Sequence, residues 1–157
     1  MKRVVILGRG GAGKTTLARQ LGDITGLPVV ELDKIFWRSG LWPTPHAEWI
    51  ELQQELTRKE NWIMDGDLGP YDAVEVRLQA SDTIIVLDFS FLRCAWRALR
   101  RAPERADFWR WLLYYRRQSV PRLREAISQH APKADVHFLR NPKAVTEFIA
   151  DVESQVH

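Results

Sequence analysis

A short apolar run followed at once by a glycine-rich stretch is the feature that most restricts how this chain can fold. The run 4-VVIL-7 has the composition of a buried strand, the stretch 8-GRGGAGKT-15 matches G-x-x-x-x-G-K-[ST], and residues 15–21 have helical spacing. Glycines leave consecutive backbone N–H groups free to converge on phosphate oxygens at a helix N-terminus. The pattern therefore predicts a phosphate-binding loop between a strand and a helix.

The residues of this loop are expected to share the work of holding a nucleoside triphosphate. Lys14 carries a positive charge that can reach the β- and γ-phosphates, and the hydroxyl of Thr15 is placed to ligate Mg²⁺. A glycine-rich turn that only connects a strand to a helix is the disfavoured alternative, because both flanking elements stand where the motif requires them. The predicted nucleotide site consists of Gly8, Gly10, Gly11, Ala12, Gly13, Lys14, Thr15 and Thr16.

Five short apolar runs divide the chain and predict the strands of a sheet. They cover residues 4–7, 28–32, 61–64, 83–87 and 135–139, and helical spacing is found at 15–21, 47–56, 91–99 and 142–152. The runs at 4–7 and 84–87 are apolar at every position, which is typical of strands covered on both faces. The pattern predicts an α/β fold with a parallel sheet and helices on both sides.

Length and cysteine content limit how such a sheet can be organised. A chain of 157 residues, 45% of them hydrophobic, can build one substantial core, so we expect a single domain over residues 1–157. The only cysteine, Cys94, excludes an internal disulfide, and the apolar run before Gly8 is too short for a signal sequence or a membrane span. We therefore expect a cytoplasmic protein with no membrane segment.

Positive charge is concentrated in one segment. Residues 93–124 contain ten arginines and two acidic residues, so this segment has a net charge of +8 and the rest of the chain −5. Arginines recur every four residues on one helical stripe, at Arg93, Arg97, Arg101 and Arg105. Apolar residues recur beyond them and would form a face against the sheet, at Phe108, Trp111, Leu112 and Tyr115. A solvated basic face and a surface for nucleic-acid phosphates are the alternatives to a role near a nucleotide.

Carboxylates follow three of the predicted strands. A phosphate loop needs one on its metal side, and both Asp65 in 62-WIMDGD-67 and Asp88 in 83-TIIVLDFS-90 qualify, with no choice between them from spacing. Asp33 follows the second strand, at the edge where ligands bind in open α/β sheets. Its carboxylate either contacts and deprotonates an acceptor hydroxyl or caps the following turn or helix.

Further side chains are candidates for holding an acceptor. Arg38 and Arg77 are possible anion clamps, although a single arginine near a loop is usually solvated. Trp37 and Trp42 either stack on a planar acceptor or cover the core. Cys94 lies beside the arginine stripe, where a lowered thiol pKa and the role of a small buried hydrophobe are both open.

Longer motifs extend over nearly the whole chain: GRGGAGKTT at 8–16, LDKIFW at 32–37, WIMDG at 62–66, VLDFSFLRCAWRALRR at 86–101 and LRNPKAV at 139–145. Together they resemble the small P-loop kinases related to adenylate kinase, and more narrowly the group labelled DNA topology modulation proteins. The resemblance implies a three-layer P-loop NTPase fold with strand order 2-3-1-4-5. It also implies transfer of the γ-phosphoryl group from ATP, with Mg²⁺, to a small acceptor such as a nucleoside monophosphate.

The resemblance also implies roles for single residues. It favours Asp65 as the carboxylate that holds the water shell of Mg²⁺. It implies a lid region at about 91–118 in which Arg97 and Arg101 stabilise the transferred group, and it places Asn141 and Pro142 beside the adenine. Asp67 departs from the group, whose members often have asparagine there, and the pattern at 33–60 differs from that of adenylate kinases, so the acceptor is not identified.

Two functions stay open from the sequence. The first is a kinase whose partners are ATP and an unidentified small acceptor. The second is a regulatory protein in which ATP changes how the arginine-rich segment binds nucleic acid, and it is disfavoured because the rest of the surface is acidic. The sequence does not distinguish a monomer from a homodimer.

Overall fold

One parallel sheet forms the centre of the protein. The computed structural model describes residues 1–101 and 106–157, apart from the side chains at 101, 107, 108, 111, 112 and 116. The strands of this sheet are β1 (Arg3–Gly8), β2 (Val29–Glu31), β5 (Trp62–Asp65), β6 (Thr83–Leu87) and β7 (Asp135–Leu139). Their spatial order, β2-β5-β1-β6-β7, confirms the predicted order 2-3-1-4-5, with every pairing parallel.

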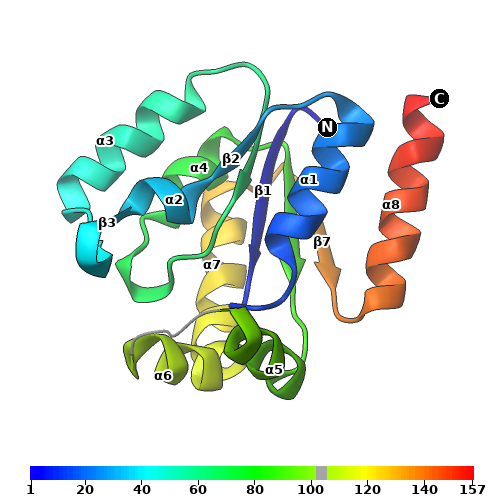
Figure 1. Ribbon diagram of the computed structural model, residues 1–157. Coiled ribbons are helices and arrows are strands. Elements are labelled where there is room, and N and C mark those ends of the chain that lie inside the picture. Colours follow the sequence, from blue (N-terminus) through cyan, green and yellow to red (C-terminus); the bar gives the residue numbers. More distant parts are fainter. Residues whose placement is uncertain (102–105) are drawn as a thin grey trace.

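Helices cover both faces of the sheet (Figure 1). On one face lie α1 (Lys14–Thr25) and α8 (Pro142–Val156), and on the other lie α4 (Val74–Ala80) and α7 (Val120–His130), with α3 (His46–Thr57) packed on α4. This arrangement confirms the three-layer α/β fold. The sequence patterns did not name α4 or α7 as helices.

The remaining elements lie around the edge at which the parallel strands end (Figure 1). The short helix α2 (Leu32–Phe36) follows β2 directly, and it leads into an antiparallel pair, β3 (Trp37–Arg38) and β4 (Trp42–Pro43). The arginine-rich segment forms α5 (Phe91–Arg101) and α6 (Ala106–Tyr114), and a π-helix (Tyr115–Ser119) joins α6 to α7. Loops, helix N-termini and charged segments therefore meet at one edge of the sheet.

Alternate side chains of β1 enter two separate cores. Val4 and Ile6 pack with α1 and α8, whereas Val5 and Leu7 pack with the layer of α3, α4 and α7. All four are fully buried. A strand enclosed on both faces needs apolar side chains at every position, which explains why its sequence shows no alternation.

The expected apolar face of the arginine-rich segment is described only in part. Phe108, Trp111 and Leu112 lie outside the described side chains, and Tyr115 is buried. Cys94 and Ala98 on α5 are also buried. No helix in the described part of the chain combines the length and the apolar composition that a membrane crossing requires.

Candidate functional site

The glycine-rich loop connects the end of β1 to the start of α1. Gly11 has a φ of 74° and Gly13, the residue before the first turn of α1, has a φ of 93°, both in the left-handed region that favours glycine. The N-cap residue of α1 is Gly13, which has no side chain, so it does not occupy the first N–H groups of the helix. The Lys14 ammonium, on a side chain only 9% exposed, donates to the carbonyl oxygens of Gly8 (3.0 Å) and Arg9 (3.2 Å).

A hydroxyl and a carboxylate meet beside this loop. Thr15 Oγ1 donates to Asp65 Oδ2 at 2.5 Å, which joins the first turn of α1 to the last residue of β5. Burial raises the pKa of Asp65, and the nearby charge of Lys14 partly offsets that effect. Hydroxyl and carboxylate oxygens are ligands that Mg²⁺ accepts in proteins, so these two residues fit the metal that the sequence implies. Of the two strand-ending aspartates, Asp65 is the one that contacts the loop hydroxyl.

Helix α5 packs directly on the glycine-rich loop. A Cβ atom on Gly11 would lie 2.4 Å from the carbonyl oxygen of Cys94, and one on Gly13 would lie 2.9 Å from a guanidinium nitrogen of Arg97. Arg97 therefore lies against the loop, next to the N-terminus of α1. The side chain of Arg101 and all of Arg105 lie outside the described residues.

The substitution Gly11→Ala is expected to separate α5 from the loop. It places a Cβ against backbone and forces a non-glycine residue into the left-handed region, whose strain alone amounts to about 1–2 kcal/mol. Gly26→Ala is the matched control, since Gly26 has a φ of 73° and nothing within 4 Å of its Cβ position. Urea unfolding should show a larger loss for Gly11→Ala, accompanied by weaker Mg·ATP binding. Equal losses in the two variants would contradict the packing argument.

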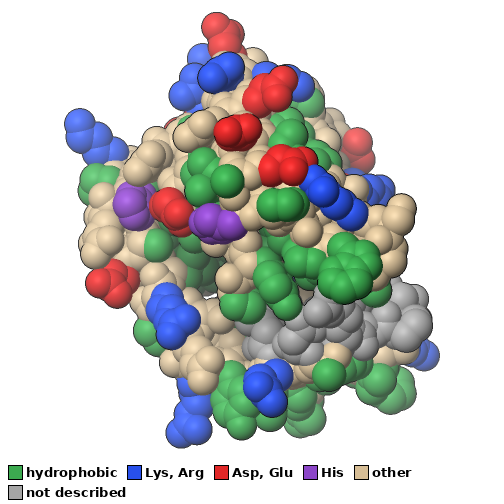
Figure 2. Space-filling view, turned by 90° about the vertical axis from the view of Figure 1, so that its left-hand side faces the viewer, with side chains coloured by type: hydrophobic (Ala, Val, Ile, Leu, Met, Phe, Trp, Pro, Cys, Tyr) green, Lys and Arg blue, Asp and Glu red, His purple; other side chains and the backbone are tan. Residues whose placement is uncertain are grey.

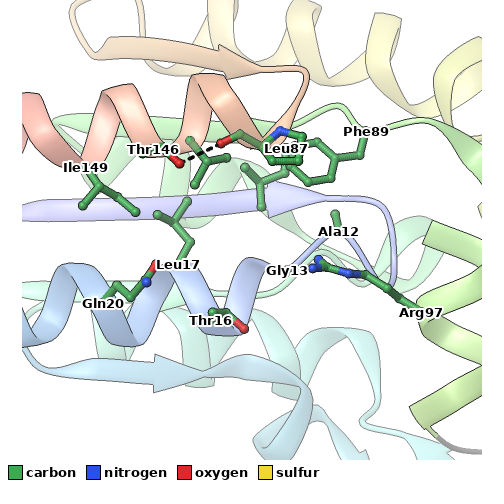
Figure 3. Close-up of a pocket in the computed structure, with 12 residues that line it drawn as sticks. Ala12, Gly13, Thr16, Leu17, Gln20, Leu87, Phe89, Arg97, Thr146 and Ile149 are labelled. Atoms are coloured by element: carbon green, nitrogen blue, oxygen red, sulfur yellow. Dashed lines mark hydrogen bonds between the residues drawn. The ribbon is translucent and has the colours of Figure 1, made fainter. Parts of the chain in front are cut away.

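A pocket of about 220 Å³ opens between α1, α5 and α8 (Figure 3). Its walls are both apolar and polar, with Leu17 and Ile149 on opposite sides, and Arg97 reaches from α5 toward Gly13 at one end. The other lining residues include Leu87, Phe89, Pro142, Gln20 and Thr146. A cavity that combines apolar walls with polar groups and adjoins a phosphate-binding loop is suited to a nucleoside, which has an apolar base face and polar edges.

The two residues predicted to border the adenine differ in position. Pro142 lines the pocket. The side chain of Asn141 is exposed and caps α8 by accepting a hydrogen bond from the backbone N–H of Ala144 at 2.9 Å. The cap occupies the Oδ1 atom of Asn141, so this oxygen is not available to a base.

Asp33 lies in the first turn of α2 with its side chain exposed. Of the two alternatives left open for Asp33, the structure does not show the helix cap, because the N-cap residue is Glu31, whose side chain forms ion pairs with Arg19 (2.7 Å) and Lys34. Among the residues that the structure describes, none forms a hydrogen bond or ion pair with the Asp33 carboxylate. The charge of Asp33 adds to the effect of burial in raising the pKa of Asp65, so the two carboxylates lie near each other.

Arg77 is not an anion clamp, contrary to one of the predictions. Its guanidinium is fully buried and binds both carboxylate oxygens of Asp72 at 2.6 and 2.8 Å. It also donates to the carbonyl of Gly66 (2.9 Å) and to the side chain of Gln53 (2.8 Å). Arg77 therefore holds the turn after β5 in place.

Of the other side chains considered for binding an acceptor, some are packed against the core and some are exposed to solvent. Trp37 packs edge-on against Phe36 and Tyr71, with ring centroids 4.8 and 5.6 Å away. Trp42 is 70% exposed. Arg38 forms an exposed ion pair with Glu48 at 2.5 Å. Burial raises the pKa of Cys94, which supports its role as a small hydrophobe over a reactive thiol.

Sequence reasoning missed the contacts of three polar residues beside the loop, two of them buried and one half-buried. Asp67 accepts hydrogen bonds from the backbone of Gly8 (3.3 Å) and from the Tyr115 hydroxyl (2.9 Å). Arg9, 3% exposed, donates to the carbonyl of Phe89 and lies over the Tyr115 ring, 5.6 Å from its centroid. Burial raises the pKa values of Asp67 and Tyr115. Of these residues, only Asp67 stood out in the sequence, because it departs from the resembled group. Arg9 did not stand out, because it occupies a variable position of the loop motif.

Comparisons with known proteins agree with this geometry. An adenylate kinase of Mycobacterium leprae is 36% identical over 87 residues, which cover 52% of this chain and 42% of that enzyme. A shikimate kinase from Acinetobacter baumannii superposes with a TM-score of 0.70 at 17% identity, over 99% of this chain and 93% of that one. The chain has the fold of the small P-loop kinases.

Other comparisons add the following. A gluconokinase from Sinorhizobium meliloti superposes with a TM-score of 0.57 at 10% identity, over 99% of this chain and 91% of that one. No protein-family model matches the sequence. The chain spans less than half of the adenylate kinase that it resembles, and the structural neighbours have low sequence identity. These matches therefore establish the P-loop kinase fold and do not identify the reaction.

Proposed function

We propose that the protein is an ATP- and Mg²⁺-dependent phosphotransferase that moves the γ-phosphoryl group to a hydroxyl of a small acceptor, such as a nucleoside monophosphate. The observation that carries this proposal is the contact between Thr15 and Asp65 beside a P-loop whose lysine is already turned toward the loop. We also propose that the protein belongs to the DNA topology modulation group, that it forms a single domain and that it is cytoplasmic.

Each residue of the site has a distinct task in this reaction. The loop N–H groups and Lys14 bind the phosphates, and the Lys14 ammonium, which has three N–H donors, can add a phosphate oxygen while it keeps the Gly8 carbonyl as a partner. Thr15 and Asp65 hold Mg²⁺, which supplies charge neutralisation on the phosphates when bound. Arg97, with Arg101, stabilises charge on the transferred group. The pocket lined by Leu17, Pro142 and Ile149 takes the nucleoside.

Asp33 is the proposed base. Its carboxylate is exposed, without a described partner, in the first turn of α2 directly after β2. A hydroxyl placed between it and the loop could transfer its proton to Asp33 as the oxygen attacks the γ-phosphorus and the bond from that phosphorus to the leaving ADP breaks. Such a site must keep water from replacing the acceptor. We therefore expect very low ATP hydrolysis when no acceptor is present.

One observation favours the second function, nucleotide-dependent binding of nucleic acid. Trp96 on α5 is 62% exposed, and the guanidinium of Arg100 lies 5.1 Å from its ring centroid, a pairing that can stack on bases and contact phosphates. The face shown in Figure 2 is less suited to DNA, because acidic side chains are interspersed with the basic ones over its upper half. This function predicts DNA affinity that falls steeply with salt concentration.

Production of ADP from Mg·ATP distinguishes the two functions. It should be measured against nucleoside monophosphates, nucleosides and small hydroxylated metabolites, with Lys14→Ala as the blank. ADP formation that depends on one acceptor class and disappears in the variant would support a kinase. Tight ATP binding without stimulation by any acceptor, together with salt-dependent DNA binding, would support the regulatory function.

The substitution Asp33→Asn is expected to lower kcat with the acceptor by about 10²-fold and to leave the affinity for Mg·ATP unchanged, because an amide cannot accept the proton. Steady-state rates with calorimetric ATP binding would test this. The control is Asp23→Asn, which removes an aspartate on α1 away from the proposed roles. A change in ATP affinity alone would contradict the role of Asp33 as base.

A further inference from the structure

The arginine-rich segment contacts the P-loop near both of its ends. Near its start, the backbone of α5 at Cys94 packs on Gly11. At the far side of α6, the chain returns to the same loop through Tyr115, the first residue of the π-helix. π-Helical turns are rare and are found preferentially at functional sites. The second contact is therefore a candidate for a functional role.

Asp67 connects Tyr115 to the loop. One oxygen of its carboxylate accepts from the Tyr115 hydroxyl (2.9 Å) and from the N–H of Gly8 (3.3 Å), and the other accepts from the N–H of Gly69 (3.1 Å). The Tyr115 side chain is fully buried and Asp67 is half-buried, so water competes little for these hydrogen bonds.

Gly8 extends this connection to the lysine. The same residue that donates its N–H to Asp67 accepts the Lys14 ammonium on its carbonyl oxygen at 3.0 Å. A displacement of Gly8 therefore displaces the partner that orients Lys14. The contacts form a continuous path from Tyr115 through Asp67 and Gly8 to Lys14.

We propose that Tyr115 and Asp67 are positioning residues that set the place of Lys14 for phosphate binding, and that they do so from the end of the arginine-rich segment. This inference rests on the proposed nucleotide site but not on the identity of the acceptor. Neither side chain contacts the nucleotide in this role. Their effect on binding must therefore pass through the lysine.

A double-mutant cycle between Tyr115→Phe and Lys14→Ala tests the path directly. Tyr115→Phe removes one hydroxyl and keeps the buried ring, and it should weaken Mg·ATP binding by about 5–10-fold, the factor expected for the loss of one ordinary hydrogen bond. In the Lys14→Ala background, the same change should alter the Kd by less than about twofold, because the group being positioned is gone. Isothermal calorimetry on the full chain gives all four dissociation constants.

The neighbouring tyrosine provides the matched control. Tyr114 is 41% exposed, and Tyr114→Phe makes the same chemical change one residue earlier, with no change in Kd expected. Thermal unfolding without nucleotide is measured for each variant, since a merely structural role would lower the Tm and leave the Kd of the folded protein intact. If Tyr115→Phe does not fold, Asp67→Asn takes its place in the same cycle.

The outcomes separate this inference from the proposed function. A Kd for Tyr115→Phe equal to that of Tyr114→Phe, or an equal loss with and without Lys14, would overturn the positioning role. Wild-type protein that binds Mg·ATP no better than Lys14→Ala would overturn the nucleotide site itself, and the inference with it. If Tyr115→Phe weakens ATP binding only when Lys14 is present, but the protein phosphorylates no acceptor, the positioning role is supported and the proposed kinase activity is overturned.

Discussion

Asp65→Asn is expected to reduce the acceptor-dependent formation of ADP by about 10³-fold, the scale seen when a charged group that stabilises the transition state is removed. An asparagine oxygen can still accept the hydrogen bond from Thr15, so the contact between α1 and β5 should survive. What is lost is the negative charge on the metal side of the loop. Initial rates over a Mg²⁺ titration should show a raised requirement for Mg²⁺, with ATP binding in the absence of metal little changed.

Asp88→Asn is the informative comparison, because Asp88 was the other strand-ending aspartate that the sequence allowed. It follows β6 and is buried, and its backbone N–H donates to Leu139. Asp88→Asn should affect the Mg²⁺ requirement much less than Asp65→Asn. Similar losses in both variants, or a larger loss at Asp88, would show that Asp65 is not the metal-side carboxylate.

Arg77→Ala is expected to destabilise the protein by about 3–5 kcal/mol, because it leaves Asp72 as a buried charge without its partner. Asp72 would retain the Trp49 indole N–H and backbone donors, which cannot replace a bidentate guanidinium. Urea unfolding measures the loss. Arg38→Ala is the matched control, since the Arg38–Glu48 pair is of similar length but exposed, and such pairs contribute about 0–1 kcal/mol.

The same pair predicts how stability depends on pH. Burial by itself would raise the pKa of Asp72, but the charge and hydrogen bonds of Arg77 outweigh it and hold this pKa below its usual value. The stabilisation is therefore complete above the pKa of an unfolded aspartate, about 3.9, and is lost as the pH falls through the lower pKa of the folded state. The difference between wild type and Arg77→Ala should shrink below about pH 4. A difference that stays constant with pH would show that lost packing, rather than charge, explains the effect.

Much of the fold could be predicted from the sequence, because the strands are short apolar runs that are visible in the composition. β6 and β7 occupy the predicted ranges, and β1 extends its predicted run by one residue at each end. The loop motif placed the start of α1 because its glycines, lysine and threonine serve one local geometry. These features depend on residues that are close in the sequence, so they can be recognised without the tertiary structure.

The polar contacts of the site could not be predicted in the same way. Helical spacing assigned Tyr115 to an apolar face, and its ring is buried, but periodicity does not reveal that its hydroxyl meets Asp67, 48 residues earlier. For Arg77 the sequence allowed a solvated or an anion-binding side chain, because its spacing reveals neither the ion pair with Asp72 nor the hydrogen bond to Gln53, which lies on a separate helix, 24 residues away. Hydrogen bonds between distant segments leave no regular spacing in a sequence.

The thiol of Cys94 makes it possible to measure how often α5 separates from the P-loop. Cys94 is fully buried, and its backbone carbonyl packs on Gly11 of the P-loop, so a labelling reagent is expected to reach its sulfur only when α5 leaves the loop. The rate of thiol modification would then count these opening events, and its ratio to the rate for a free thiol would give the opening free energy. Slower labelling in the presence of Mg·ATP would report nucleotide occupancy without any added fluorophore or assay enzyme.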